Sequence, residues 1–407
     1  MHIRRPSTAI FWLLGALACG RVWATDWEVS LDTRLVSADG EKSYLDGGMG
    51  ILRYGSDRSG VQLGRARVAI SQDLGQILVL KLDASAWGEH DKNPVDLTEA
   101  YFELRPYPRS GWRVRLKGGA FYAPISLENR TEGWESPYTL SSSALDSWVA
   151  EELRTIGLEA KVDWMGTRLG HDFDVGLAAA VFGWNEPAGV ELATSGFNIT
   201  DWQSSLFGRV GPYGAAPFGA VREYQQIDSH AGYYVGANLK YLDRLTVQAL
   251  HYDNRADPTA ENEITGVYAW KTKFDTAGLR FEDDSGWTAI VQWLGGETSV
   301  WPDDVGLLKW DFSTRYALLS KRLGRNTLSA RYDNFDVTPS APGSSGDQSG
   351  HAWTLAYRFE LDKHWRLTLE WVNARSTQSN RAIFFGEAPF ATQNQLQLAI
   401  RYAIGSR

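Results

Sequence analysis

The sequence predicts an all-β protein, a 16-stranded antiparallel transmembrane β-barrel. Short segments in which apolar and polar side chains alternate recur along the chain, and this period of two is typical of strands with two different faces. Beyond the first 24 residues, no apolar run approaches the roughly 20 residues of a membrane-spanning helix. Short turns and long polar links alternate between the segments. This rhythm is typical of closed membrane barrels, which place turns on one side of the bilayer and loops on the other.

Sixteen segments carry the alternating pattern at about the length of a tilted membrane strand. They are 27–36, 62–73, 77–86, 97–105, 112–122, 153–164, 173–182, 232–241, 245–252, 274–282, 287–295, 310–320, 327–335, 352–359, 365–372 and 395–403. An even number of strands places both ends of the barrel on the short-turn, periplasmic side. One further alternating stretch, 202–210, would make the number odd, so we place it inside the long link 183–231.

Residues 1–24 have the features of an export signal that is removed. Two arginines precede an apolar run at 10–18, which is too short to span a bilayer, and Val22-Trp23-Ala24 offers a small-residue cleavage site. Cys19 leaves a lipoprotein open, but the residues before it favour cleavage after Ala24. The mature chain, 25–407, is then predicted to be one barrel without cysteine and without disulfides.

Composition narrows the functional classes. Removing the signal takes three Arg and no acid, which leaves 38 basic against 49 acidic residues and a net charge of −11. An acidic exported protein is a poor candidate for binding nucleic acid. Sixteen of the 18 Trp remain, and large aromatics suit the boundary between lipid and water. A soluble all-β protein would alternate too, but the aromatic faces, the export signal and the regular links favour a membrane barrel.

The alternation also predicts which side chains face lipid and which face the lumen. If the polar row of the segment 310–320 faces the lumen, Arg315 lies inside the barrel and Trp310 and Phe312 face lipid. Lumen cations outnumber lumen anions by 13 to 9, so the excess acid belongs to loops and the exterior. The predicted cations are Arg65, Arg67, Lys81, Arg113, Arg115, Lys117, Lys161, Arg280, Arg315, Arg331, Arg358, Arg366 and Arg401; the anions are Asp83, Glu99, Glu103, Glu159, Asp163, Asp174, Asp311, Asp333 and Glu370.

The stretch 112–152 organises the predicted lumen. Arg113, Arg115 and Lys117 form one polar row, and the chain then breaks at Ala123-Pro124 into a long link. We predict that this link, about 123–152, folds into the barrel as a constriction loop. A row of cations makes a pore favour anions, but the same cations can instead pair with acids on neighbouring strands and stiffen the wall. Both roles stay open at this point.

Several motifs resemble the phosphate-selective porin O and P family. They are the acidic-aromatic run Glu99–Leu104, the basic strand start Arg113-Val114-Arg115, the loop opening Gly119–Glu128, the loop Ser136–Trp148 with Glu151–Gly157, and the strands Leu328–Phe335 and Gln395–Tyr402. The resemblance implies a 16-stranded trimeric porin in the bacterial outer membrane. Strict phosphate selection is not carried over, because Arg130 is the only cation between Ile125 and Ala150.

The sequence therefore predicts a porin, a passive diffusion channel for small hydrophilic solutes, with an anion preference left open. The predicted pore-lining residues are Arg67, Lys81, Arg113, Arg115, Lys117, Arg130 and Arg331, and the predicted constriction acids are Glu128, Glu132, Glu135 and Asp146. We expect Arg113, Arg115 and Lys117 to face one or more of these four acids across the lumen. A phosphate- or anion-selective channel is the alternative within transport; a lipid-modifying outer-membrane enzyme or a structural barrel are alternatives of other classes.

The expected partners are outer-membrane lipid, small hydrophilic or anionic solutes and two further copies of the chain, with no nucleic acid. No catalytic residue, metal ligand or cofactor is predicted, because the sequence shows neither a His/Glu metal spacing nor a Gly-x-Ser-x-Gly turn.

Overall fold

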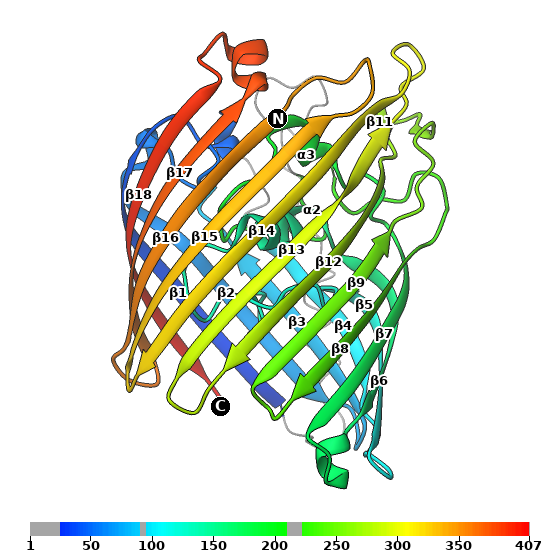
Figure 1. The fold of residues 1–407 in the computed structure, drawn as a ribbon, viewed down its shortest axis with the longest axis vertical. Helices are drawn as coiled ribbons and strands as arrows, with labels where there is room; N and C mark the ends of the chain where they lie inside the picture. The colour runs from blue at the N-terminus through cyan, green and yellow to red at the C-terminus, as the bar shows by residue number, and fades with distance from the viewer. Residues whose placement is uncertain (1–24, 90–94, 210–221, 407) are drawn as a thin grey trace, which may run out of the picture.

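In the computed structural model, which describes residues 25–89, 95–209 and 222–406, sixteen strands close into an antiparallel barrel (Figure 1). The strands are β1 (Thr25–Asp39), β2 (Gly60–Asp73), β3 (Leu78–Ala86), β4 (Val95–Leu104), β5 (Trp112–Phe121), β6 (Thr155–Trp164), β7 (Phe173–Gly183), β8 (Gly232–Tyr241), β9 (Leu245–Asp253), β12 (Lys271–Glu282), β13 (Trp287–Val300), β14 (Leu308–Leu323), β15 (Asn326–Pro339), β16 (Gln348–Glu360), β17 (Trp365–Gln378) and β18 (Phe390–Gly405). Each pairs with its neighbour in sequence, and β1 pairs with β18 to complete the ring. A two-stranded hairpin, β10 (Glu261–Asn262) with β11 (Val267–Tyr268), lies in the loop between β9 and β12.

The predicted fold class is confirmed, and each of the sixteen predicted segments is a strand of the barrel. Strands β12 to β18 continue further toward the loop end than predicted. In β17, for example, pairing runs on to Gln378, although the outward row has already become polar at Asn373 and Arg375. The alternation of apolar and polar residues stops where the wall leaves lipid, while backbone pairing continues beyond it. The stretch 202–209 lies in the loop after β7 and forms no strand.

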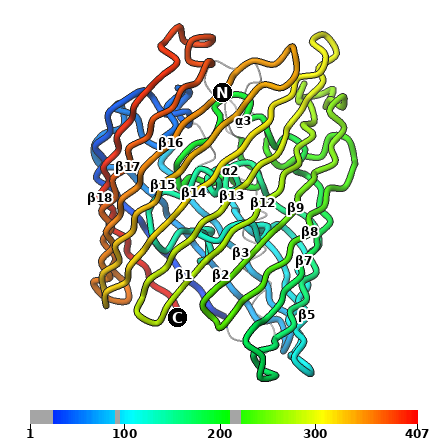
Figure 2. Tube along the Cα trace, in the orientation of Figure 1, coloured from blue at the N-terminus to red at the C-terminus, as the bar shows by residue number. Residues whose placement is uncertain are grey.

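Short turns gather at one end of the barrel and long loops at the other, here named the turn end and the loop end (Figure 2). The start of β1 and the end of β18 lie together at the turn end, where Glu28 pairs with Gly405. The predicted signal, 1–24, falls outside the described residues. No helix in the described ranges is long and apolar enough to cross a bilayer.

The predicted facing of β14 is wrong. Trp310, Phe312, Tyr316 and Leu318 are 2–4% exposed and point into the lumen, while Asp311 is 57% exposed on the outer wall beside the exposed Arg315. Alternation separates two faces without saying which one is inside. The polar face usually lines the lumen, but here folded loops occupy the lumen and offer β14 an apolar partner. Asp311 and Arg315 therefore leave the set of lumen charges.

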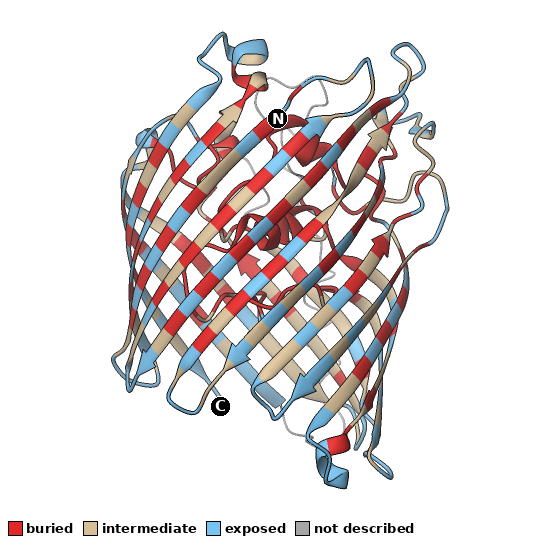
Figure 3. Cartoon of the chain, in the orientation of Figure 1, coloured by how far each residue is buried: buried red, intermediate tan, exposed pale blue. Residues whose placement is uncertain are grey.

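Two loops fold into the loop-end half of the barrel (Figure 1). The first, 122–154, includes α2 (Ala144–Glu152), and the second, 184–204, includes α3 (Val190–Thr194). Most residues of both loops are buried, as the red interior of Figure 3 shows, and 130–132 of the first loop are exposed to the lumen. Shorter helical turns are η2 (Tyr44–Asp46), η3 (Ser56–Arg58), η4 (Gly166–Leu169) and the π-helical η5 (Arg381–Phe385).

An aromatic cluster joins these loops to the wall. Trp148 of α2 is fully buried, and its ring lies 5.4 Å from Phe274, 5.1 Å from Phe312 and 6.2 Å from Phe197 of the second loop. Aromatic contacts of this kind add to the burial of large apolar surfaces. The inserted loops thus form a packed core with β12 and β14, which explains why the apolar row of β14 faces inward.

Candidate functional site in the barrel lumen

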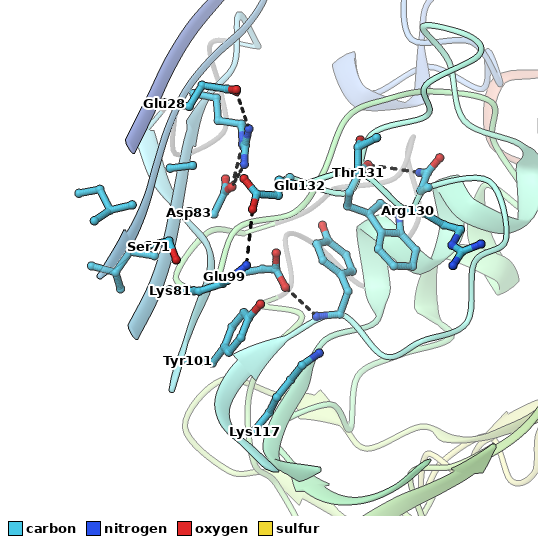
Figure 4. Close-up of a pocket in the computed structure, with 18 of the residues that line it drawn as sticks. Glu28, Ser71, Lys81, Asp83, Glu99, Tyr101, Lys117, Arg130, Thr131 and Glu132 are labelled. Carbon is cyan, nitrogen blue, oxygen red and sulfur yellow. Dashed lines mark hydrogen bonds and ion pairs between the residues drawn. The ribbon is translucent and has the colours of Figure 1, made fainter. Parts of the chain in front are cut away.

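A cavity of about 360 Å³ remains in the lumen on the turn-end side of the first inserted loop (Figure 4). Strands β1 to β6 supply its wall, and residues 122–134 of the loop supply its roof. Lys81, Lys117, Glu99 and Glu132 point into the space from opposite sides. The cavity is therefore a charged, water-accessible chamber at the place where we predicted the constriction.

Two glutamines on the far wall fix the start of this loop. Gln292 of β13 accepts from the Leu127 N–H at 3.0 Å and donates to the Ile125 carbonyl at 2.7 Å. Gln248 of β9 donates to the Pro124 and Ile125 carbonyls at 2.7 and 2.9 Å. These bonds satisfy backbone groups that insertion removes from water. Side chains from two strands thus hold the segment after Ala123 across the lumen.

The predicted cationic row lies on the lumen face of β5 and pairs with its neighbour β6. Arg113 and Arg115 each contact Asp163 at 3.0 Å, and Lys117 lies 3.6 Å from Glu159. The register between the strands sets these partners, because it places Arg113 beside Asp163 and Lys117 beside Glu159. Lys161 also shares Asp163, at 3.8 Å. Four cations therefore share two carboxylates.

The cations and carboxylates of this patch lie at different depths. The four cations are 23–40% exposed, while Asp163 is 10% and Glu159 is 4% exposed. The acids lie against the wall, where Glu159 also accepts from the Tyr234 hydroxyl at 2.6 Å. The surface that the β5–β6 patch presents to the lumen is therefore positive, although each of its cations has a partner.

The other predicted pore-lining residues fall into three environments. Lys81 is 26% exposed in the cavity and lies 3.5 Å from Glu132, and Arg130 reaches the same cavity with no ion pair among the described residues. Arg67 is 3% exposed between Asp83 and Glu28. Arg331 is fully buried under the loop. Arg331 therefore does not face the cavity.

Glu128, Glu135 and Asp146 do not pair with the β5 row, so the expected pairing across the lumen is wrong for these three acids. Glu128 lies 2.8 Å from Arg331 and is fully buried. Glu135 pairs with Arg65 at 3.2 Å and with Arg401. Burial alone would raise the pKa of Glu135, but Arg401 and Arg65 outweigh it and lower the pKa to about 2. Glu128 and Glu135 thus bind arginines of β2, β15 and β18, while Glu132 lies beside Lys81 of β3.

Asp146 lies in the first turn of α2 and has a structural role there. Ser143 caps this helix by accepting from the Asp146 N–H at 3.2 Å, a standard use of serine. Burial, followed by the charge of Glu128, raises the pKa of Asp146 well above its usual value. Asp146 is fully buried and therefore presents no carboxylate to a constriction. Among the described residues, no group of three or more His, Cys, Asp or Glu is arranged to hold a metal.

Two groups of functional residues were missed by the sequence reasoning. Arg154 lies 3.6 Å above the Tyr122 ring, which stacks on Trp134 at 4.2 Å, and this column closes the cavity roof. In the second loop, Asp201 binds Arg34 at 2.5 Å and Arg53 at 2.9 Å. The lumen facing of Arg34 could have been found from its alternation in β1. Nothing in the sequence around Asp201 indicates that this residue enters the lumen.

The closed ring of sixteen strands, with an apolar exterior and loops folded into its lumen, decides the fold. This is a porin fold. A barrel of this construction lies in the bacterial outer membrane. No family model matches the sequence, and no curated protein matches it either.

Solved structures share the fold at low sequence identity. OmpF of Salmonella typhi, solved with daunomycin, is 10% identical with a TM-score of 0.55, over 94% of this chain and 98% of that chain. The outer membrane channel DcaP of Acinetobacter baumannii is 9% identical with a TM-score of 0.54, over 94% and 96%. A loop-deletion mutant of OmpT of Vibrio cholerae is 12% identical with a TM-score of 0.52, over 94% and 100%.

Proposed function

We propose that this protein is an outer-membrane channel for the passive diffusion of small hydrophilic solutes, and that it prefers anions. The β5–β6 patch carries this proposal, because its four cations are 23–40% exposed and their two carboxylates at most 10%. Lys117 and Lys161 of this patch line the cavity, whereas Asp163 and Glu159 do not. Guanidinium and ammonium groups at this position can replace part of the hydration shell of an anion.

The test is the reversal potential of the purified protein in a planar bilayer under a KCl gradient. We expect a potential of the anion-selective sign. Replacing Arg113, Arg115 and Lys117 together with glutamine removes three positive charges from the β5–β6 patch and should bring the anion-to-cation permeability ratio down to about 1 or below. A cation-selective wild type would contradict the anion preference, and an absence of conductance would contradict the channel.

A matched control removes a charge of the same sign from outside the lumen. Lys273 faces outward on β12, where it pairs with Glu297 at 3.0 Å and is 44% exposed. Lys273→Gln should leave the reversal potential unchanged, because its charge lies outside the lumen. An equal shift in this variant would mean that overall charge, rather than the cavity wall, sets the selectivity.

A structural barrel is the second candidate, and one observation favours it. Most residues of 122–154 and 184–204 are buried, so inserted loops fill much of the loop-end lumen. A closed lumen would give a stable barrel with no conductance at any voltage. The bilayer measurement therefore decides between the channel and the structural barrel.

We assign no reaction to the protein. His230 contacts Asp228 at 3.1 Å and His251 contacts Asp275 at 2.8 Å, but both histidines are at least 40% exposed and neither lines the lumen cavity. We further propose a homotrimer. OmpT of Vibrio cholerae, which shares the fold at 13% identity and a TM-score of 0.50, was solved in a trimer form.

A further inference from the structure

A second, smaller cavity of about 50 Å³ lies between the first inserted loop and the opposite wall, formed by β1, β2 and β16 to β18. Its charged lining is unbalanced. Five arginines contribute to it: Arg34, Arg65, Arg358, Arg366 and Arg401. Three carboxylates contribute: Asp32, Glu135 and Asp201. The sequence predicted that four of these arginines, all but Arg34, face the lumen. It did not predict that they lie close together.

Four of the five arginines have carboxylate partners. Arg34 binds Asp32 at 2.9 Å and Asp201 at 2.5 Å. Arg366 binds Glu360 at 2.7 Å, outside the cavity. Arg65 and Arg401 share Glu135, and with Arg67 they form a network that includes Asp83 and Glu28. In that network three cations meet three acids, so its charges balance.

Arg358 of β16 is the exception. Its side chain is 7% exposed, and no carboxylate of the described residues lies within 4 Å of it. It donates to the carbonyls of Pro137 at 2.5 Å, Ser136 at 3.1 Å and Thr139 at 3.5 Å, and its Nε has no hydrogen-bond partner. Glu370 on the neighbouring β17 turns instead to the Ser141 hydroxyl at 2.8 Å.

A buried charge without a counter-charge is costly, since carbonyl dipoles replace its hydration only in part. Arg358 is such a charge at this cavity, whereas each of the other four arginines that line it contacts a carboxylate. The volume is a few times the roughly 10–15 Å³ that one water needs. Charge and size together select one small monovalent anion.

We propose that this cavity binds a single inorganic anion of the chloride class beside Arg358, and that the anion holds residues 135–142 of the first inserted loop against the wall. Arg358 already holds the loop through three of its carbonyls, and the anion supplies the charge that those carbonyls lack. The site differs from the β5–β6 patch, where every cation has a carboxylate. It does not depend on whether the barrel conducts.

The experiment compares thermal unfolding of the refolded full chain in chloride and in gluconate at equal ionic strength. A ligand that binds only the folded state raises the melting temperature by mass action. We expect a saturable rise with chloride in the wild type and no rise in Arg358→Gln. Arg322→Gln, at the exposed turn end, should keep the wild-type response. A chloride response that persists in Arg358→Gln, or no response in the wild type, would overturn the site.

A second measurement does not depend on the variant folding. Crystals of the wild type grown in bromide should show one anomalous peak between Arg358 and the loop. Water alone at that position would overturn the proposal. A larger stabilisation by phosphate than by chloride at equal ionic strength would overturn the assignment of a monovalent anion.

Discussion

At the scale of single residues, buried charges decide how the first inserted loop is held. Arg331 of β15 is fully buried and lies 2.8 Å from both Glu128 and Asp333. Its guanidinium also donates to the Ser141 and Ser142 carbonyls at 2.7 Å. One side chain thus binds Asp333, two residues away, together with Glu128 and a loop carbonyl that lie 203 and 190 residues away in sequence.

We expect Arg331→Met to destabilise the barrel by about 3–5 kcal/mol, because it leaves Glu128 and Asp333 as buried acids without their cation. Urea unfolding of the protein refolded in lipid vesicles measures this loss. The control is Lys273→Gln, which breaks a largely exposed pair on the outer wall and should cost at most about 1 kcal/mol. A loss below 1 kcal/mol in Arg331→Met would show that the buried pair does not stabilise the loop.

At the scale of elements, α2 and α3 meet through buried carboxyl groups. Glu152, at the end of α2, accepts from the Trp148 indole at 2.6 Å and from the backbone of Gly189 and Glu191 at 2.8 Å. Burial raises the pKa of Glu152 to about 7 and that of Glu191 well above its usual value. Both groups lie in the inserted loops, so their titration acts on the contact between the loops.

The raised pKa of Glu152 determines whether the contact between the inserted loops becomes more or less stable as pH rises. A carboxyl whose pKa is higher in the folded state contributes stability below its unfolded pKa, about 4.3, and this stability is lost as pH rises through about 7. We expect the inserted loops to resist limited proteolysis better at pH 5 than at pH 8. Glu152→Gln should reduce this difference, because it removes one of the titrating groups. Equal protection at both pH values in the wild type would contradict the assignment.

At the scale of the whole molecule, the inserted loops change which side chains of the barrel wall face the lumen. The lumen rows of β13 and β14 are rich in apolar residues because they pack on the inserted loops instead of facing water. Leu318 is 3% exposed inside the barrel, and Leu319, the next residue of β14, is 50% exposed on the outer wall.

Single cysteines at these two neighbouring positions test the orientation of β14. We expect Leu319→Cys in lipid vesicles to react with a lipid-soluble maleimide and Leu318→Cys to stay unmodified, because only the outer position meets lipid. Full reaction of both variants after unfolding serves as the control. The reverse pattern would restore the facing that the sequence predicted.

Much of the fold could be predicted from the sequence because its signal is local. A strand between lipid and lumen repeats every two residues, so each of the sixteen segments can be recognised alone. The lumen position of Arg113, Arg115 and Lys117 follows from the same alternation. Their partners on β6, Asp163 and Glu159, could not be predicted in this way, because β6 follows the long first loop and the register between β5 and β6 fixes the pairs.

The sequence by itself determined the number of strands, their order and the inward row of most of them. Only the tertiary structure decided that β14 turns its aromatic row inward, that a second loop enters the lumen and that Glu128 meets Arg331 across 203 residues. The physical reason is that these features depend on contacts between distant segments. The local period of a strand carries no information about the segments that fill the lumen. These segments decide which charged side chains stay exposed to a solute.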